Sequence, residues 1–482
     1  MNHHLLPDIS GPGKIGCTIP VSDVPAAELP AKELLRDELG LPEVSEVELV
    51  RYFTALGKTN YGVDTGFYPL GSCTMKYNPK WHEDIPKLSG FAAIHPYQAE
   101  DAVQGALQLM FELQNYLTEI TGMQRTSLTP IAGAHGELAG LFMVKAYHET
   151  RKDTARRKIL LTDSSHGTNP SSAIMSGYGV DVVESDKNGN VDMKSLDLLM
   201  NEEVAALTLT MPSTLGLFDP QIIEISELVH KRGGLLGADG ANLNALLCNV
   251  KFGDLGYDYV QLNLHKTFST PHGGGGPGSG PICAMDNLID FLPEPIVAAI
   301  DGKYKLVTPT KSIGKICTFF GNFGVMAKAY AYIHTMGAGG LKQAGIDSVI
   351  NANYLKEKLK SHYYLPYDCT CMHEVVFSGD RQKAKGVRTL DIAKRLLDFG
   401  LHPPTVYFPL IVDEAMMTEP TETESKASLD TYIETMIQIA KEAEENPDML
   451  HSAPHSTPVR RLDEVRAARQ PDLRWQWGES KG

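Results

Sequence analysis

This chain lacks an excess of basic residues, long apolar runs and paired cysteines. The 482 residues include 44 Lys and Arg against 59 Asp and Glu, which gives a formal net charge of −15. This balance argues against nucleic acid or an anionic membrane surface as the main partner. No apolar run reaches the length that spans a membrane. We therefore expect a protein that binds neither nucleic acid nor membrane.

The seven cysteines lie at scattered positions and show no spacing typical of a zinc site. Cys369 and Cys371 are separated by one residue, so they do not form a Cys-x-x-Cys pair. We expect no bound metal, and reduced thiols in a cytoplasmic protein. The N-terminal residues contain neither the apolar core of a signal peptide nor an Arg-rich presequence, in agreement with this expectation.

A chain of this length is too long for one compact core, so two or more domains are expected. Prolines recur through residues 1–40 at spacings that forbid long helices or strands. This segment is either an arm that wraps over another surface or a loose tail. We divide the chain into an N-terminal arm with an active-site loop (1–95), a large domain (96–340) and a small C-terminal domain (341–482).

Short apolar strands alternate with helices along the central part of the chain. Strands are predicted over 158–162, 180–184, 205–211, 234–238, 259–264 and 281–285, and helices over 102–121, 171–177, 193–200 and 222–232. Another helix opens within 129–137 and runs to about residue 147. Further elements are helices 43–58, 319–338, 341–361, 389–399 and 429–444, and strands 374–377 and 405–410. Such alternation is typical of an α/β fold with a largely parallel sheet covered by helices.

A single lysine stands at the end of one of these predicted strands. Lys266 follows strand 259–264, and a glycine run begins at Gly273. Ligands bind at the carboxyl ends of strands in open α/β sheets, and a lysine there can form a Schiff base with an aldehyde cofactor. The alternative is a lysine that only faces water. Four consecutive glycines destabilise a chain unless its backbone must approach something closely, which favours a functional role.

A turn of small residues leads into the predicted helix that runs to about residue 147. Gly133, Ala134, His135 and Gly136 form this turn. Such a turn presents free backbone N–H groups at the positive end of a helix dipole, which is a suitable site for a phosphate. A plain helix N-terminus without a ligand is the other interpretation.

Polar clusters follow three of the predicted strands, at Ser164–Asn169, Ser213–Thr214 and Asp239–Asn242. The carboxyl ends of parallel strands lie along one edge of a sheet, so these clusters can share one site with Lys266. A cofactor with an aldehyde, a phosphate and a pyridine ring needs this set of groups. Pyridoxal 5′-phosphate requires an imine lysine, a phosphate cradle, a carboxylate beside the ring nitrogen and a flat group on the ring. The candidates are Lys266, the 132–136 turn, Asp239 and His166.

The order of these motifs resembles the aspartate-aminotransferase fold, or fold type I, of pyridoxal phosphate enzymes. That resemblance implies a mostly parallel seven-stranded sheet covered by helices, with a smaller C-terminal α/β domain. Longer motifs resemble the P-protein family of the glycine cleavage system, in particular the lysine-bearing second subunit of its split form. They are Pro69–Lys76, His166–Pro170, Thr214–Phe218, Asp239–Asn242, His265–Gly280, Glu419–Ser425 and Val459–Glu464. Met211-Pro-Ser-Thr departs from the expected Asn-Pro-Asn-Thr, which puts the polar contacts of that loop in doubt.

The resemblance implies decarboxylation of glycine, release of CO2 and transfer of the aminomethyl group to the lipoyl arm of H-protein. The implied partner is a homologous subunit 1, in a heterodimer or a heterotetramer made of two heterodimers. Implied catalytic residues are Lys266, Asp239 and His166. Implied cofactor contacts are Gly133, Ala134, His135, Asn242, His265 and Thr214, with Thr318 and Gly321 reaching in from a neighbouring subunit. Ser72 and Thr74, in a loop rich in hydroxyls, are the expected ligands of the glycine carboxylate.

Two other functions use the same residues or the same fold. One is a different fold-type I enzyme, such as an amino-acid decarboxylase or a cysteine desulfurase, which would need no lipoyl acceptor. The other is a scaffold subunit without catalysis, which would need neither Lys266 nor Asp239. Nucleotide binding by the glycine run is excluded, because the run lacks the Gly-Lys-Ser/Thr ending of a phosphate-binding loop.

Overall fold

The computed structural model describes residues 5–37, 39–273 and 278–474. The chain forms two compact units, one of residues 66–454 and one of residues 1–65 together with 455–482. The prediction of a close backbone approach at the glycine run falls mainly on residues 274–276, outside the described residues. Within the described chain, no helix combines the length and apolar character that crossing a membrane requires.

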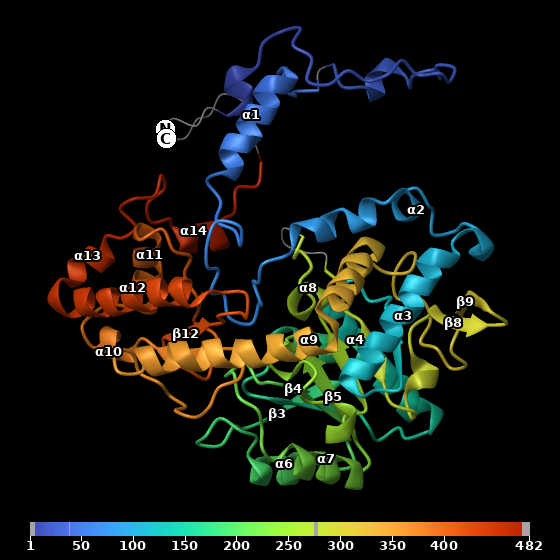
Figure 1. The fold of residues 1–482 in the computed structure, drawn as a ribbon, viewed down its shortest axis with the longest axis vertical. Coiled ribbons are helices and arrows are strands. Elements are labelled where there is room, and N and C mark those ends of the chain that lie inside the picture. The colour runs from blue at the N-terminus through green and yellow to red at the C-terminus, as the bar shows by residue number, and fades with distance from the viewer. Residues whose placement is uncertain (1–4, 38, 274–277, 475–482) are drawn as a thin grey trace. The chain divides into compact units, whose positions relative to one another are not determined.

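A seven-stranded sheet organises the larger unit and confirms the predicted fold class (Figure 1). Its spatial order is β1-β7-β6-β5-β4-β2-β3. The strands are β1 (Arg125–Ser127), β2 (Lys158–Thr162), β3 (Gly179–Val183), β4 (Val204–Thr210), β5 (Leu235–Gly240), β6 (Tyr259–Leu262) and β7 (Ile282–Ala284). Strands β3, β2, β4, β5 and β6 run parallel, whereas β7 pairs antiparallel with both β6 and β1.

Helices cover both faces of this sheet. They are α3 (Gln104–Thr121), α4 (Gly133–Thr150), α5 (Thr168–Met175), α6 (Met193–Leu199), α7 (Ile222–Lys231), α8 (Leu264–Thr267) and α9 (Phe323–Leu359). Two separate apolar cores lie on the sheet: Leu207 belongs to the core that includes residues of α3, α7 and α9, and Ala206 belongs to the core that includes residues of α4 and α5. Burial on both faces explains why the central strands are continuous apolar runs.

A smaller α/β layer follows the sheet domain. Its three-stranded antiparallel sheet has the order β10 (Val375–Ser378), β12 (Ala415–Thr418), β11 (Thr405–Val406). Three of its helices are α11 (Thr389–Asp398), α12 (Lys426–Glu445) and α13 (Pro447–His451), and the short α10 (Asp380–Lys383) follows β10. The second half of α9 packs into the core of this layer through Leu355 and Leu359, so one helix links the two layers (Figure 1).

Several predicted elements differ from the structure in their bounds. The helices predicted over 319–338 and 341–361 form one run, Phe323–Leu359, in which only Gly337 is non-helical, with φ 59°. The strand predicted over 405–410 ends at Val406, because Tyr407 adopts φ 58° and leaves the extended conformation. The prediction lacked β1, β12 and the hairpin of β8 (Ile296–Ile300) and β9 (Lys303–Val307). The division at residues 95 and 340 stays a prediction.

The smaller unit contains α1 (Glu46–Gly57) and α14 (Glu464–Arg469). Helix α1 begins with a capping box, in which Ser45 and Glu48 exchange hydrogen bonds. The segment before it carries exposed apolar side chains, among them Ile19 and Val21. The wrapping arm and the loose tail both stay predictions for this segment.

Candidate active site

A cavity of about 220 Å³ lies at the carboxyl ends of the parallel strands. Most of the predicted site residues line it: Lys266, Asp239, His166, Gly133, Ala134, Asn242, His265, Thr214 and Ser72. These residues come from six separate stretches of the chain between residues 72 and 266. The sheet brings them together as expected for ligand sites at strand ends.

Lys266 reaches the cavity from α8, directly after β6. Strand β6 is buried along its whole length, and its pairing with β5 fixes where the chain leaves the sheet. The lysine is partly buried. A rigid strand thus presents a primary amine to an enclosed space, which is the arrangement that imine formation requires.

Asp239 lies at the end of β5 and is 3% exposed. Its carboxylate accepts hydrogen bonds from Asn169 Nδ2 at 3.2 Å, from Ala241 N at 3.1 Å and from Thr210 Oγ1 at 3.4 Å. Buried charges persist in proteins when they are hydrogen-bonded in this way. The chain thus holds a fixed carboxylate on the cavity wall.

The N-terminus of α4 forms another wall of the cavity. Gly133 and Ala134 line it, and the first backbone N–H groups of this 18-residue helix lack intrahelical partners. A Cβ on Gly133 would lie 2.4 Å from Oδ1 of Asn263, so only glycine lets the helix approach this closely. The chemistry of this wall suits a phosphate group.

His166 precedes α5 and is joined to the cavity wall by hydrogen bonds. Its Nδ1 accepts the backbone N–H of Thr168 at 3.3 Å and lies 3.0 Å from Thr168 Oγ1. The same hydroxyl lies 3.0 Å from Oε1 of Glu137. Burial lowers the pKa of His166, with Asp239 raising it and Lys266 lowering it. His166 is therefore a neutral imidazole at neutral pH.

His265, beside Lys266, is also neutral. Burial, with smaller contributions from His272 and Lys266, lowers its pKa to about 3. Its Nδ1 accepts the backbone N–H of Ser279 at 3.3 Å. A Cβ on Gly278 would lie 1.9 Å from this nitrogen, so a side chain at that position would displace the imidazole.

The loop 69–76 reaches the cavity and is held there by two buried acidic side chains, Glu374 and Glu419. Ser72 and Thr74 adopt φ of 65° and 50°. The backbone N–H of Ser72 donates to Glu374 at 2.6 Å. Glu419 accepts both the N–H and the hydroxyl of Thr74, at 2.8 and 2.7 Å. These ion-to-amide hydrogen bonds offset the strain of the left-handed backbone.

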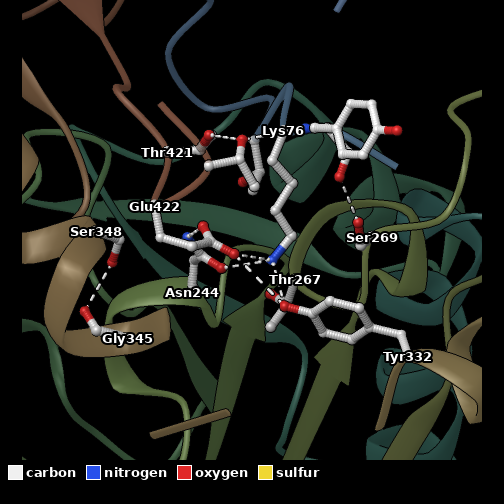
Figure 2. Close-up of polar contacts among 12 residues, drawn as sticks. Lys76, Asn244, Thr267, Ser269, Tyr332, Gly345, Ser348, Thr421 and Glu422 are labelled. Carbon is white, nitrogen blue, oxygen red and sulfur yellow. Dashed lines mark hydrogen bonds and ion pairs between the residues drawn. The ribbon is translucent and has the colours of Figure 1, made fainter. Parts of the chain in front are cut away.

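Lys76 anchors the end of the same loop (Figure 2). Its ammonium donates to Glu422 at 2.7 Å, to Asn244 at 3.1 Å and to Tyr332 at 3.3 Å. The lysine side chain is 1% exposed and that of Glu422 is 9% exposed. A buried pair with its hydrogen bonds satisfied fixes the loop between the sheet domain and the segment after β12.

Cys73, in the middle of this loop, is not an activated thiol. Burial raises its pKa to about 11, although the charge of Lys266 acts in the opposite direction. The thiolate is the nucleophilic form of cysteine. Cys73 thus remains protonated and unreactive at neutral pH.

Some predicted site residues lie outside the cavity lining. Thr74 is buried behind it with its hydroxyl donated to Glu419. His135 is not among the residues that line the cavity, and its Nδ1 accepts the backbone N–H of Ile131. Thr318 is exposed, and Gly321 packs on the carbonyl of Leu128. Contacts of Thr318 and Gly321 with a neighbouring subunit stay a prediction.

The sequence analysis gave no site role to four groups in and behind the wall: Glu137, His373, Glu374 and Glu419. Glu137 follows the phosphate turn directly as the fifth residue of α4, but its burial beside Asp239 has no local signal. The other carboxylates come from a segment some 300 residues further along the chain. No local pattern predicts that they hold the 69–76 loop.

The residues of this cavity fit pyridoxal 5′-phosphate. Lys266 supplies the amine for its aldehyde, and the α4 N-terminus supplies donors for its phosphate. A buried carboxylate already held by three hydrogen bonds, Asp239, supplies the partner of its ring nitrogen. The fold and the site together define a pyridoxal phosphate enzyme of fold type I.

The comparisons with known proteins identify the family. Residues 344–456 match the family described as glycine dehydrogenase, C-terminal domain, and residues 140–275 match aminotransferase class V. A probable glycine dehydrogenase (decarboxylating) subunit 2 from Caldanaerobacter subterraneus subsp. tengcongensis is 59% identical, with 98% of each chain covered. That from Bacillus velezensis is 54% identical, covering 98% of this chain and 97% of the relative. The chain belongs to the family of glycine dehydrogenase (decarboxylating) subunit 2, whose cofactor is pyridoxal 5′-phosphate.

Solved structures of low sequence identity share the fold. The P-protein glycine decarboxylase of the glycine cleavage system, in inhibitor-bound form, matches with a TM-score of 0.72 at 18% identity. The match covers 85% of this chain and 93% of that one. A cysteine desulfurase from Thermococcus onnurineus NA1 matches with a TM-score of 0.58 at 16% identity, covering 75% and 90%. At these identities the matches support the fold alone.

Proposed function

We propose that this chain is the cofactor-bearing subunit of a two-subunit glycine decarboxylase that transfers an aminomethyl group to the lipoyl arm of H-protein. The observation that carries the proposal is the convergence of Lys266, Asp239 and the α4 N-terminus on one cavity, in a chain whose relatives match over almost its full length. We further propose that it acts in the cytoplasm with its seven cysteines reduced; all seven are free thiols.

Each residue has a proposed role at a stated atom. Lys266 Nζ would hold the cofactor through its aldehyde. The carboxylate of Asp239 keeps the ring nitrogen protonated, and His166 packs on the ring. Gly133 and Ala134, with His135 nearby, hold the phosphate. Bound pyridoxal phosphate supplies an electron sink for the pair left behind when the glycine carboxylate departs as CO2.

The substrate end of the cavity is proposed to lie at the 69–76 loop. Ser72 lines the cavity there, whereas the Thr74 hydroxyl is already bound by Glu419. Ser72 is thus the better candidate for a direct contact with the glycine carboxylate, and Thr74 supports it by shaping the loop. Asn242, His265 and Thr214 complete the proposed wall around the cofactor.

The proposed partners are a homologous subunit 1 and lipoylated H-protein. The relatives carry the name subunit 2, which supports a partner subunit for this chain. Two such heterodimers would form the proposed heterotetramer. Thr318 and Gly321 are proposed to reach the cofactor of an adjacent subunit.

The test is release of labelled CO2 from carboxyl-labelled glycine by the chain, its subunit 1 and lipoylated H-protein. The proposal expects release that depends on the lipoyl group, on both subunits and on Lys266. Equal release without H-protein would favour another fold-type I enzyme, such as an amino-acid decarboxylase. A scaffold subunit would be favoured if the wild type released no CO2 above background and Lys266→Ala left that background rate unchanged.

A further inference from the structure

The hydrogen bonds around His166 fix where its protons lie. Nδ1 of His166 accepts the backbone N–H of Thr168 at 3.3 Å. A backbone N–H only donates, so this nitrogen carries no proton of its own. The imidazole is neutral, since burial lowers its pKa. Its single ring proton is therefore on Nε2.

The Thr168 hydroxyl lies between two groups and has one proton to give. Its oxygen is 3.0 Å from His166 Nδ1 and 3.0 Å from Glu137 Oε1. Because Nδ1 has no proton, the first contact is a hydrogen bond only if Thr168 donates to it. With an ionised Glu137, the Thr168 hydroxyl would donate to Oε1 and leave no proton for Nδ1; with a neutral Glu137, the carboxylic acid donates to Thr168 instead. Both contacts are satisfied together when Glu137 is a neutral carboxylic acid.

The surroundings of Glu137 favour this protonation state. The residue is 8% exposed, and its second oxygen, Oε2, is buried without a hydrogen-bond partner among the described residues. The titratable groups facing it are Asp239 on β5, Tyr259 on β6 and Lys266 on α8. Burial, and then the charge of Asp239, raise the pKa of Glu137 to about 8, although Thr168 and Lys266 act against this.

Two carboxyl groups in one poorly solvated region divide into one charged and one neutral group. Asp239 accepts three hydrogen bonds from donors of the protein, whereas the partners of Glu137 are the hydroxyls of Thr168 and Ser172, which can accept a hydrogen bond as well as donate one. The negative charge therefore stays on Asp239, and the proton stays on Glu137.

We propose that Glu137 is a positioning residue that holds a proton at neutral pH and, through Thr168, keeps His166 in its Nε2–H tautomer. The chain Glu137–Thr168–His166 links the floor of the cavity to the group proposed to pack on the cofactor ring. Its kinetic consequence rests on the proposed function, but the protonation state of Glu137 does not.

The primary test is infrared difference spectroscopy of the full chain loaded with pyridoxal phosphate. Spectra at pH 7 and pH 10 are compared for the wild type, for Glu137→Gln and for Glu149→Gln, an exposed glutamate on the same helix. We expect a carbonyl stretch of a protonated carboxylic acid in the wild type and in Glu149→Gln, absent from Glu137→Gln, that disappears with a midpoint near pH 8. Glu419, whose pKa burial also raises, is present in all three and cancels.

Absence of that band from the wild-type minus Glu137→Gln difference would overturn the proposal, whether or not the enzyme is active. Thr168→Val provides a second infrared test if Glu137→Gln does not fold. It removes the acceptor of the Glu137 proton, so the carboxylic acid band must shift to higher frequency. An unshifted band would also overturn the proposal.

The kinetic test uses the ratio of two rates. A glutamine at position 137 can donate its N–H to Thr168 at any pH, whereas the wild-type glutamate loses its proton near pH 8. The turnover ratio of Glu137→Gln to wild type should therefore rise through pH 8, while Glu137→Ala should be slow throughout. A constant ratio alongside the expected infrared band would refute the role in positioning His166 but not the proposed function.

Discussion

At the scale of single residues, the site depends on which groups carry charge. His166 and His265 are neutral because burial lowers their pKa values. Among the acidic residues of the wall, Asp239 accepts hydrogen bonds from three donors, and Glu137 keeps its carboxyl proton. The result is a cavity in which Asp239 and the Lys266 amine stand beside two neutral imidazoles, His166 and His265.

Replacement of Asp239 by asparagine tests the charge on the wall. The amide keeps the size of the side chain but cannot keep a ring nitrogen protonated. Loss of one preorganised electrostatic partner costs about 10²–10³-fold in kcat in comparable sites, and we expect a loss of that order for glycine decarboxylation. The cofactor should still bind, as seen by its absorbance. A rate within about threefold of the wild type would contradict the role given to Asp239.

The depressed pKa of His265 predicts a stability that depends on pH. The unfolded imidazole binds its proton near pH 6.5, whereas the folded one binds it only at about pH 3. Between these values the unfolded state holds more protons, so stability falls as the pH is lowered from 6.5 toward 3. Denaturant unfolding of the wild type and His265→Asn at pH 7 and pH 5 measures this.

The variant should lose less stability than the wild type over that pH interval. The exposed His451→Asn variant serves as the control and should behave like the wild type. Equal slopes in all three proteins would show that His265 does not contribute.

The position of single residues also explains which site residues the sequence could predict. Lys266, Asp239 and His166 stand at strand ends, where a periodic apolar run marks the position and the residue type marks the chemistry. Glu137 lies within a helix, and nothing in its neighbours indicates that it is buried beside Asp239. Its protonation depends on contacts with Thr168 that only the folded backbone creates.

At the scale of elements, the loop 69–76 is held in the site by contacts with distant parts of the chain. It is tied to the small domain by Glu374 and Glu419 and to the sheet domain by Lys76 (Figure 2). These contacts join residues more than 150 positions apart in the chain, so the local sequence predicts the loop but not its attachment.

Replacement of Lys76 by methionine tests this attachment. The variant leaves the Glu422 carboxylate buried without its cation, which typically costs about 3–5 kcal/mol. We expect a loss of this order in the free energy of unfolding of the larger unit, measured by denaturant titration. The double variant Lys76→Met/Glu422→Leu, which removes both charges, should recover much of the loss. A Lys76→Met protein as stable as the wild type would show that the pair does not hold the loop.

The sheet strands themselves were predictable where burial on both faces demands a continuous apolar run, as in β2, β4 and β6. Strand β1 was missed because its three residues, Arg125, Thr126 and Ser127, include no apolar side chain; only pairing with β7 makes them a strand. Strand β11 was predicted too long because the left-handed backbone of Tyr407 has no sequence signal in a non-glycine residue.

At the scale of the whole molecule, α9 runs from the core of the sheet domain to the core of the small domain. The single non-helical residue, Gly337, lies in its first half. The active-site cavity takes residues from both layers, with Lys266 from the sheet domain and Glu374 from the small one. A change in their relative placement would therefore alter the substrate side of the cavity before the cofactor side.

The measurement that tests the central claim most directly is reduction of the cofactor-loaded chain with borohydride, followed by mass spectrometry of its peptides. The account predicts a visible absorbance band that borohydride abolishes, and a pyridoxyl adduct on Lys266 alone. The Lys266→Ala variant should show neither. An adduct on another lysine, or no adduct after loading in the presence of subunit 1, would contradict the assignment of this cavity as the catalytic site.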